Sequence, residues 1–135
     1  MKIIFFITIV LLFTNCKKVG KNHEINSKWK VEYYIENAIT INIPVAAGDT
    51  YIQFNKKRFT CQIPVGQLAG YCEIYKDGTM DITGVDVSLL GGDSTKMYWE
   101  DFFVNKLLTT SSYYIKESSI LNLNYPEGSM VLSKQ

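Results

Sequence analysis

From residue 28 onward, the chain consists of short runs in which apolar and polar residues alternate, with polar turns between the runs. Alternation with a period of two predicts a strand that buries one face. In the first run, Trp29, Val31, Tyr33 and Ile35 are therefore expected to point into the core. The expected strands cover residues 28–35, 39–43, 51–54, 58–63, 71–75, 79–87, 112–116, 120–125 and 130–133. Short strands at near-regular spacing predict a mainly β fold, an antiparallel meander closed into a small barrel.

One segment departs from this alternation and predicts a single helix over about residues 98–109. Positions i, i+3, i+4, i+7 and i+8 of this segment are Trp99, Phe102, Phe103, Lys106 and Leu107, which places the aromatic residues on one helical face. Asp93, Ser94 or Thr95 is the expected N-cap, and Glu100 and Asp101 suit the positive end of the helix dipole. An aromatic stripe at this spacing is typical of a helix that covers the side or mouth of a barrel.

The pairing of the strands at 58–63 and 71–75 is predicted from the apolar pattern. With Cys61 opposite Cys72, Phe59 faces Ile74 and the apolar residues of both strands share one face. In the next hairpin, a three-residue loop 76–78 with Gly78 in the left-handed conformation sets Ile74 against Met80.

The N-terminus predicts export. Lys2 is followed by an apolar run from Ile3 to Phe13 and then by Cys16, which is the layout of a bacterial lipoprotein signal, cleaved before an acylated cysteine. The run is too short for a conventional transmembrane helix, which needs about 20 apolar residues. We expect a signal peptide at 1–15, a lipidated Cys16 with a flexible tether at 16–27, and one domain at 28–135. The alternative is an ordinary signal peptide with a chance cysteine near its end.

Composition excludes several classes of function. After cleavage the chain carries 13 basic and 13 acidic side chains, and this balance argues against a nucleic-acid partner. The basic residues at 17, 18, 21 and 28 could keep the tether solvated, which is the simpler interpretation. The alternative is that they bind anionic lipid headgroups. His23, in the tether, is the only histidine, so the domain has no Ser-His-Asp or Cys-His catalytic set and no histidine-based zinc site. We expect no cofactor and no metal.

The cysteines predict one disulfide. Lipidation of Cys16 leaves Cys61 and Cys72 as an even pair in an oxidising compartment, and the expected register places them opposite each other. The alternative is that both are small apolar core residues with free thiols.

Residues 28–133 resemble the META domain family, also called HslJ-like. The matching stretches are Phe59-Thr60-Cys61-Gln62, Gly70-Tyr71, Asp77-Gly78-Thr79-Met80-Asp81-Ile82, Thr95-Lys96-Met97, Glu100 with Phe103 and Leu107, Tyr114-Ile115 and Leu121-Asn122-Leu123, and Trp29 fits the opening strand. The chain departs from the family pattern at 60–62, where Gly-Cys-Asn is usual, and at Tyr98, where a cysteine is common. Cys72 would then replace that missing partner.

The resemblance implies an antiparallel barrel of lipocalin-like topology with one helix, often found on envelope lipoproteins and loosely linked to stress and antibiotic tolerance. It implies no enzyme activity and no catalytic residues. By resemblance to enteric sorting, Lys17 after the lipidated cysteine favours the outer membrane of a Gram-negative bacterium.

Three functions remain as hypotheses. The first is a non-enzymatic, lipid-anchored protein that binds or supports other envelope components. The second is a carrier of a small apolar ligand inside the barrel. The third is a carboxylate-based hydrolase that uses residues from Asp81, Asp86, Asp93, Glu100 and Asp101. The volume inside the barrel discriminates between the first two, because a carrier needs a cavity of several hundred cubic ångströms.

Overall fold

The computed structural model of the chain describes residues 24–89 and 91–135. The predicted signal peptide, Cys16, His23 and most of the predicted tether lie outside the described residues. The elements in chain order are β1 (Lys28–Glu36), β2 (Ile39–Asn42), the 3-10 helix η1 (Val45–Ala47), β3 (Tyr51–Asn55), β4 (Arg58–Ile63), β5 (Gly66–Ile74), β6 (Met80–Leu89), α1 (Ser94–Leu108), β7 (Ser112–Lys116), β8 (Ile120–Tyr125) and β9 (Gly128–Lys134).

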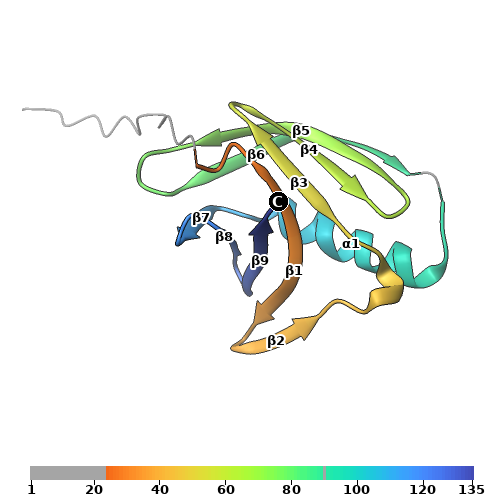
Figure 1. The fold of residues 1–135 in the computed structure, drawn as a ribbon. Coiled ribbons are helices and arrows are strands. Elements are labelled where there is room, and N and C mark those ends of the chain that lie inside the picture. Colours follow the sequence, from red (N-terminus) through yellow and green to blue (C-terminus); the bar gives the residue numbers. More distant parts are fainter. Residues whose placement is uncertain (1–23, 90) are drawn as a thin grey trace, which may run out of the picture.

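All the strands belong to one antiparallel sheet with the order β6-β5-β4-β3-β1-β9-β8-β7, and β2 pairs only with β1. The sheet curls so that β3–β6 form one layer and β1, β8 and β9 another, with α1 between them on the inner side (Figure 1). The two ends of the sheet meet at a single bridge between Thr79 and Ser112, which is supported by hydrogen bonds from Met80 N to Ser111 O and from Tyr113 N to Gly78 O, both 2.9 Å. The sheet is therefore a half-barrel that is drawn together at one point. The predicted fold class, a mainly β antiparallel barrel-like sheet with one helix, is confirmed.

The inside of this half-barrel is filled by side chains. Trp29, Ile52, Phe54 and Phe59 from the strands meet Phe103 and Leu107 of α1 in one apolar cluster. Burial of this surface is the main force that holds the helix against the sheet, at about 25 cal/mol per Å² of apolar area removed from water.

The helix begins earlier than the sequence pattern predicts. The Asp93 carboxylate accepts a hydrogen bond from Lys96 N at 3.0 Å and is the N-cap, so α1 begins at Ser94 rather than near 98. The first turn is exposed at Met97 and Tyr98 and therefore carries no apolar periodicity. Phe103 and Leu107 are buried as predicted, whereas Trp99 and Phe102 are half-buried.

A salt bridge ties α1 to the strands beside it. Lys106 Nζ lies 2.7 Å from Glu36 Oε1, and the Tyr125 hydroxyl donates to the same oxygen at 3.1 Å. The hydrogen bond to Glu36 raises the pKa of Lys106. This Lys106 contact joins the C-terminal half of the helix to the β1–β2 hairpin and to β8.

The alternation in β1 is correct only in its first half. Trp29 and Val31 are buried, but a bulge in the pairing with β9 lies between Val31 and Tyr33. A bulge adds one residue to a strand and reverses the faces beyond it. Tyr34 is consequently the buried residue, and the prediction that Tyr33 and Ile35 point into the core is wrong.

The register of β4 with β5 also differs from the expected one. Cys61 pairs with Leu68 and Phe59 with Gly70, because the strands are joined by a two-residue turn at Pro64 and Val65 rather than by a six-residue loop. The shift is four residues, so each side chain stays on its predicted face. The next hairpin is as predicted: Gly78 has φ 84° and Ile74 pairs with Met80.

The ordered domain begins before residue 28. Ile25 is fully buried, and its carbonyl oxygen accepts a hydrogen bond from Trp29 Nε1 at 3.0 Å. Asn26 Oδ1 accepts a hydrogen bond from Lys56 N at 3.1 Å. The prediction of a flexible tether up to residue 27 is therefore wrong for Ile25 to Ser27, which pack on the sheet.

Candidate functional site

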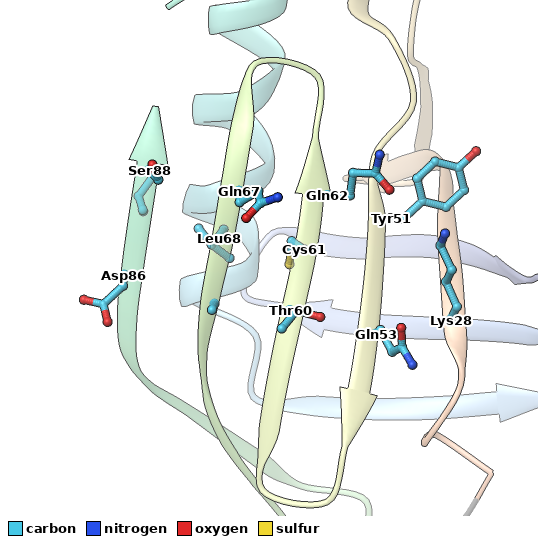
Figure 2. Close-up of a pocket in the computed structure, with 12 residues that line it drawn as sticks. Lys28, Tyr51, Gln53, Thr60, Cys61, Gln62, Gln67, Leu68, Asp86 and Ser88 are labelled. Atoms are coloured by element: carbon cyan, nitrogen blue, oxygen red, sulfur yellow. The ribbon is translucent and has the colours of Figure 1, made fainter. Parts of the chain in front are cut away.

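The candidate site is a hollow of about 460 Å³ on the outer face of the sheet, open to solvent and lined by both polar and apolar groups (Figure 2). It runs across β3, β4, β5 and β6, with Lys28 of β1 at one side. Twelve residues line it: Lys28, Tyr51, Gln53, Thr60, Cys61, Gln62, Gln67, Leu68, Ala69, Asp86, Val87 and Ser88.

The pairing of the strands arranges the polar side chains of this hollow in two rows. Tyr51, Gln62, Gln67 and Ser88 are successive cross-strand partners and form the first row. The second row is the series Lys28, Gln53, Thr60, Ala69 and Asp86. Neighbouring strands lie about 4.8 Å apart, so each row is a ladder of groups at regular spacing.

The hollow is uncharged along its centre. Lys28 stands at one side, 4.7 Å from the centre of the Tyr51 ring, and Asp86 stands at the other on β6. Between them, the amides of Gln53, Gln62 and Gln67 are exposed, and within the described part of the chain they have no hydrogen-bond partner in the protein. The hollow therefore offers amide and hydroxyl groups to a ligand without a competing internal bond.

Sequence reasoning did not identify these glutamines as a site. The alternation at 58–63 predicts that such side chains point outward. The cross-strand pairing that places them side by side depends on the β4–β5 register, which the sequence analysis did not predict.

The five carboxylates considered for hydrolysis do not form a pair. Asp81 and Asp86 are five residues apart on β6, about 17 Å along the strand. Asp93 caps α1, and Asp101 is exposed on the helix. Glu100 is buried, and its Oε1 accepts a hydrogen bond from Val65 N at 2.6 Å.

Asp81 takes part in a separate contact on the outer face. The Tyr75 hydroxyl lies 2.9 Å from Asp81 Oδ2 and 2.9 Å from Glu73 Oε2, so it bridges two carboxylates that face each other across β5 and β6. These two hydrogen bonds raise the pKa of Tyr75. Within the described residues, no group of three or more His, Cys, Asp or Glu side chains is placed to hold a metal ion.

Cys61 and Cys72 are both buried and both free. Cys61 faces Leu68, and Cys72 lies four residues further along β5. The predicted Cys61–Cys72 disulfide is therefore wrong, because the two-residue β4–β5 turn moves the partners about 13 Å apart along the strands. Burial raises the pKa of the Cys61 thiol and raises the pKa of Cys72 to about 11. Since the thiolate is the nucleophilic form, neither cysteine is activated for chemistry at neutral pH.

The described part of the chain contains no helix of the length and apolar character needed to cross a membrane. Lipid attachment concerns Cys16, which lies outside the described residues, and stays a prediction.

No protein-family model matches the sequence, and no curated protein matches it. Two solved structures are similar. An NMR structure of a protein from Burkholderia xenovorans has a TM-score of 0.66 and 11% identity over 82% of each chain. The crystal structure of a DUF4847 family protein from Bacteroides vulgatus ATCC 8482 has a TM-score of 0.60 and 15% identity, over 82% of this chain and 95% of the other. The likeness shows the fold alone.

Proposed function

We propose that this chain is a lipid-anchored protein of the bacterial cell envelope, with a META/HslJ-like domain that binds another envelope component and catalyses no reaction. The hollow on the outer face of the sheet, with its two rows of outward side chains, is the observation that carries this proposal. The filled interior favours binding at the outer surface over transport of an apolar ligand. A lipoprotein sorted to the outer membrane, with a stress-related role, remains what the sequence predicts.

The chemistry of the hollow fits an uncharged ligand rich in hydroxyl and amide groups. Exposed glutamine amides and the hydroxyls of Thr60 and Ser88 both donate and accept hydrogen bonds. Tyr51 adds an aromatic ring with a polar tip, a side chain often used at binding surfaces. The glycan strands of peptidoglycan have this chemistry and belong to the proposed compartment, so we take them as the ligand.

A co-sedimentation experiment with purified peptidoglycan sacculi tests this ligand. The protein used is residues 16–135 with Cys16→Ser, which keeps every described residue and carries no lipid. The double variant Gln62→Ala/Gln67→Ala should bind about tenfold more weakly, because each lost hydrogen bond contributes roughly 0.5–1.5 kcal/mol and 1.4 kcal/mol is tenfold.

The matched control is Thr40→Ala/Asn42→Ala, which removes two exposed polar side chains from β2, away from the hollow. Its binding should equal that of the parent. Equal binding by parent, hollow variant and control, or no binding of the parent, would reject the glycan ligand.

The lipid anchor has its own test. Cys16→Ser in the full-length chain should release the protein from the membrane fraction into the soluble envelope fraction, because the acyl chains can no longer be attached. Each buried CH₂ contributes about 0.8 kcal/mol to anchoring, so the loss of several chains is decisive. Fractionation followed by immunoblotting measures the shift, and metabolic labelling with palmitate should mark the wild type alone. Retention of the unlabelled variant in the membrane would contradict anchoring through Cys16.

A further inference from the structure

Five basic side chains gather where the chain enters the domain. Lys28 begins β1, and Lys56, Lys57 and Arg58 lie in and beside the β3–β4 turn. Lys134 ends β9, next to β1. We call these five residues the basic collar. All five are exposed.

Hydrogen bonds fix the parts of the collar relative to one another. Asn26, two residues before Lys28, accepts the hydrogen bond from Lys56 N at 3.1 Å. Gln135 N donates to Lys28 O at 3.0 Å, which places the end of β9 beside the start of β1. Figure 1 shows the start of β1 and the β3–β4 turn on the side of the molecule where the chain enters.

The collar contrasts with the rest of the domain in charge. The described residues contain ten basic and thirteen acidic side chains, so the collar holds half of the positive charge of a net negative domain. Lys30 and Lys106 lie elsewhere and form ion pairs, whereas none of the five collar residues forms an ion pair within the described part of the chain.

Four acidic residues lie near the collar and reduce its charge without cancelling it. Glu24 precedes it in sequence, Glu117 lies in the β7–β8 turn, whose Ser119 O accepts a hydrogen bond from Lys134 N at 2.9 Å, and Glu73 and Asp81 line a hollow with Lys57. The Tyr75 hydroxyl already binds both of the latter carboxylates. Five positive against four negative charges leave the collar positive.

The residues before the collar add to the same charge. Lys17, Lys18 and Lys21 lie between the proposed lipid site, Cys16, and Glu24. Eight residues span at most about 29 Å when fully extended. If Cys16 carries lipid, the collar is therefore within reach of the headgroups of the same membrane.

We propose that the basic collar docks on the anionic headgroups of a lipid bilayer and so turns the domain with its chain-entry side toward the membrane. This inference goes beyond the proposed function and rests on it only for the nearness of a membrane. Each Lys or Arg at an anionic surface contributes about 1 kcal/mol, roughly a fivefold change in binding, and the contribution decreases as salt shortens the Debye length.

Vesicle co-sedimentation tests the collar without the lipid anchor. Residues 16–135 with Cys16→Ser are mixed with vesicles of phosphatidylcholine, with or without phosphatidylglycerol. The parent should bind the phosphatidylglycerol vesicles alone, and added salt should weaken the binding. Lys56→Glu/Lys57→Glu should weaken it at least about tenfold, because two attractive charges become repulsive.

The matched control is Lys96→Glu/Thr40→Glu/Asn42→Glu, which makes the same change in net charge, minus four, in the first turn of α1 and on β2, both outside the collar. It should bind within about threefold of the parent. Equal weakening by the two variants would mean that net charge alone explains the effect, and would overturn the proposal. The proposal would also be overturned if the parent bound vesicles with and without phosphatidylglycerol equally well, or bound neither. Failure here would leave the fractionation result for Cys16→Ser untouched, so the two proposals fail separately.

Discussion

Glu100 is the residue whose role differs most from its sequence-based interpretation. The sequence places Glu100 near the positive end of the helix dipole and among the candidate catalytic carboxylates. Instead, Glu100 lies in the second turn of α1 with a 2% exposed side chain, and its Oε1 accepts the hydrogen bond from Val65 N. Without that acceptor, the N–H group of Val65 in the β4–β5 turn would lose its partner. The sequence could not predict this, because the two residues are 35 positions apart.

Glu100→Ala should lower the free energy of unfolding by about 1.5–3 kcal/mol, the contribution typical of a hydrogen bond to a charged group. Glu100→Gln keeps an acceptor oxygen and should lose less. Asp101→Ala is the control, since Asp101 is exposed on the same helix, and should change stability by less than about 0.5 kcal/mol. Urea unfolding followed by circular dichroism measures all three. Equal effects of Glu100→Ala and Asp101→Ala would show that the bond to Val65 does not stabilise the fold.

At the scale of elements, the sequence predicts strands better than the pairing between them. The Gly78 loop was correct because only one loop length kept Met80 on the apolar face opposite Ile74. The predicted β4–β5 pairing was wrong. A shift of four residues keeps every side chain on the same face of the sheet, so periodicity cannot distinguish the two registers. The two-residue turn at Pro64 and Val65 sets the observed register, and Gly70 is compatible with it, since a Cβ there would lie 2.8 Å from the Phe59 ring. Glycine is therefore the residue that lets this ring lie across β5.

At the scale of the whole molecule, the mainly β class and the α-helix found among the described residues were predictable, whereas the candidate site was not. The hollow combines side chains from five strands, and their rows exist only once every register is set. The half-barrel shape has the same origin. Its two ends touch near Thr79 and Ser112, which periodicity places on strands but does not bring together.

The start of the domain gives the last prediction, because Ile25 to Ser27 pack on the sheet and Ile25 joins its apolar core. Ile25 is fully buried in the core, and Ser27 O accepts a hydrogen bond from Phe54 N at 3.3 Å. Ile25→Ala should therefore lower the free energy of unfolding by about 2–5 kcal/mol, the usual cost of such a truncation in a packed core. Val45→Ala is the matched control, since Val45 is 99% exposed, and should change stability by less than about 0.5 kcal/mol. Urea unfolding of residues 16–135 with Cys16→Ser, followed by tryptophan fluorescence, measures both, because Trp29 is buried against Ile25. If the two variants unfold at the same urea concentration, residues 25–27 belong to the tether and the folded domain begins at residue 28.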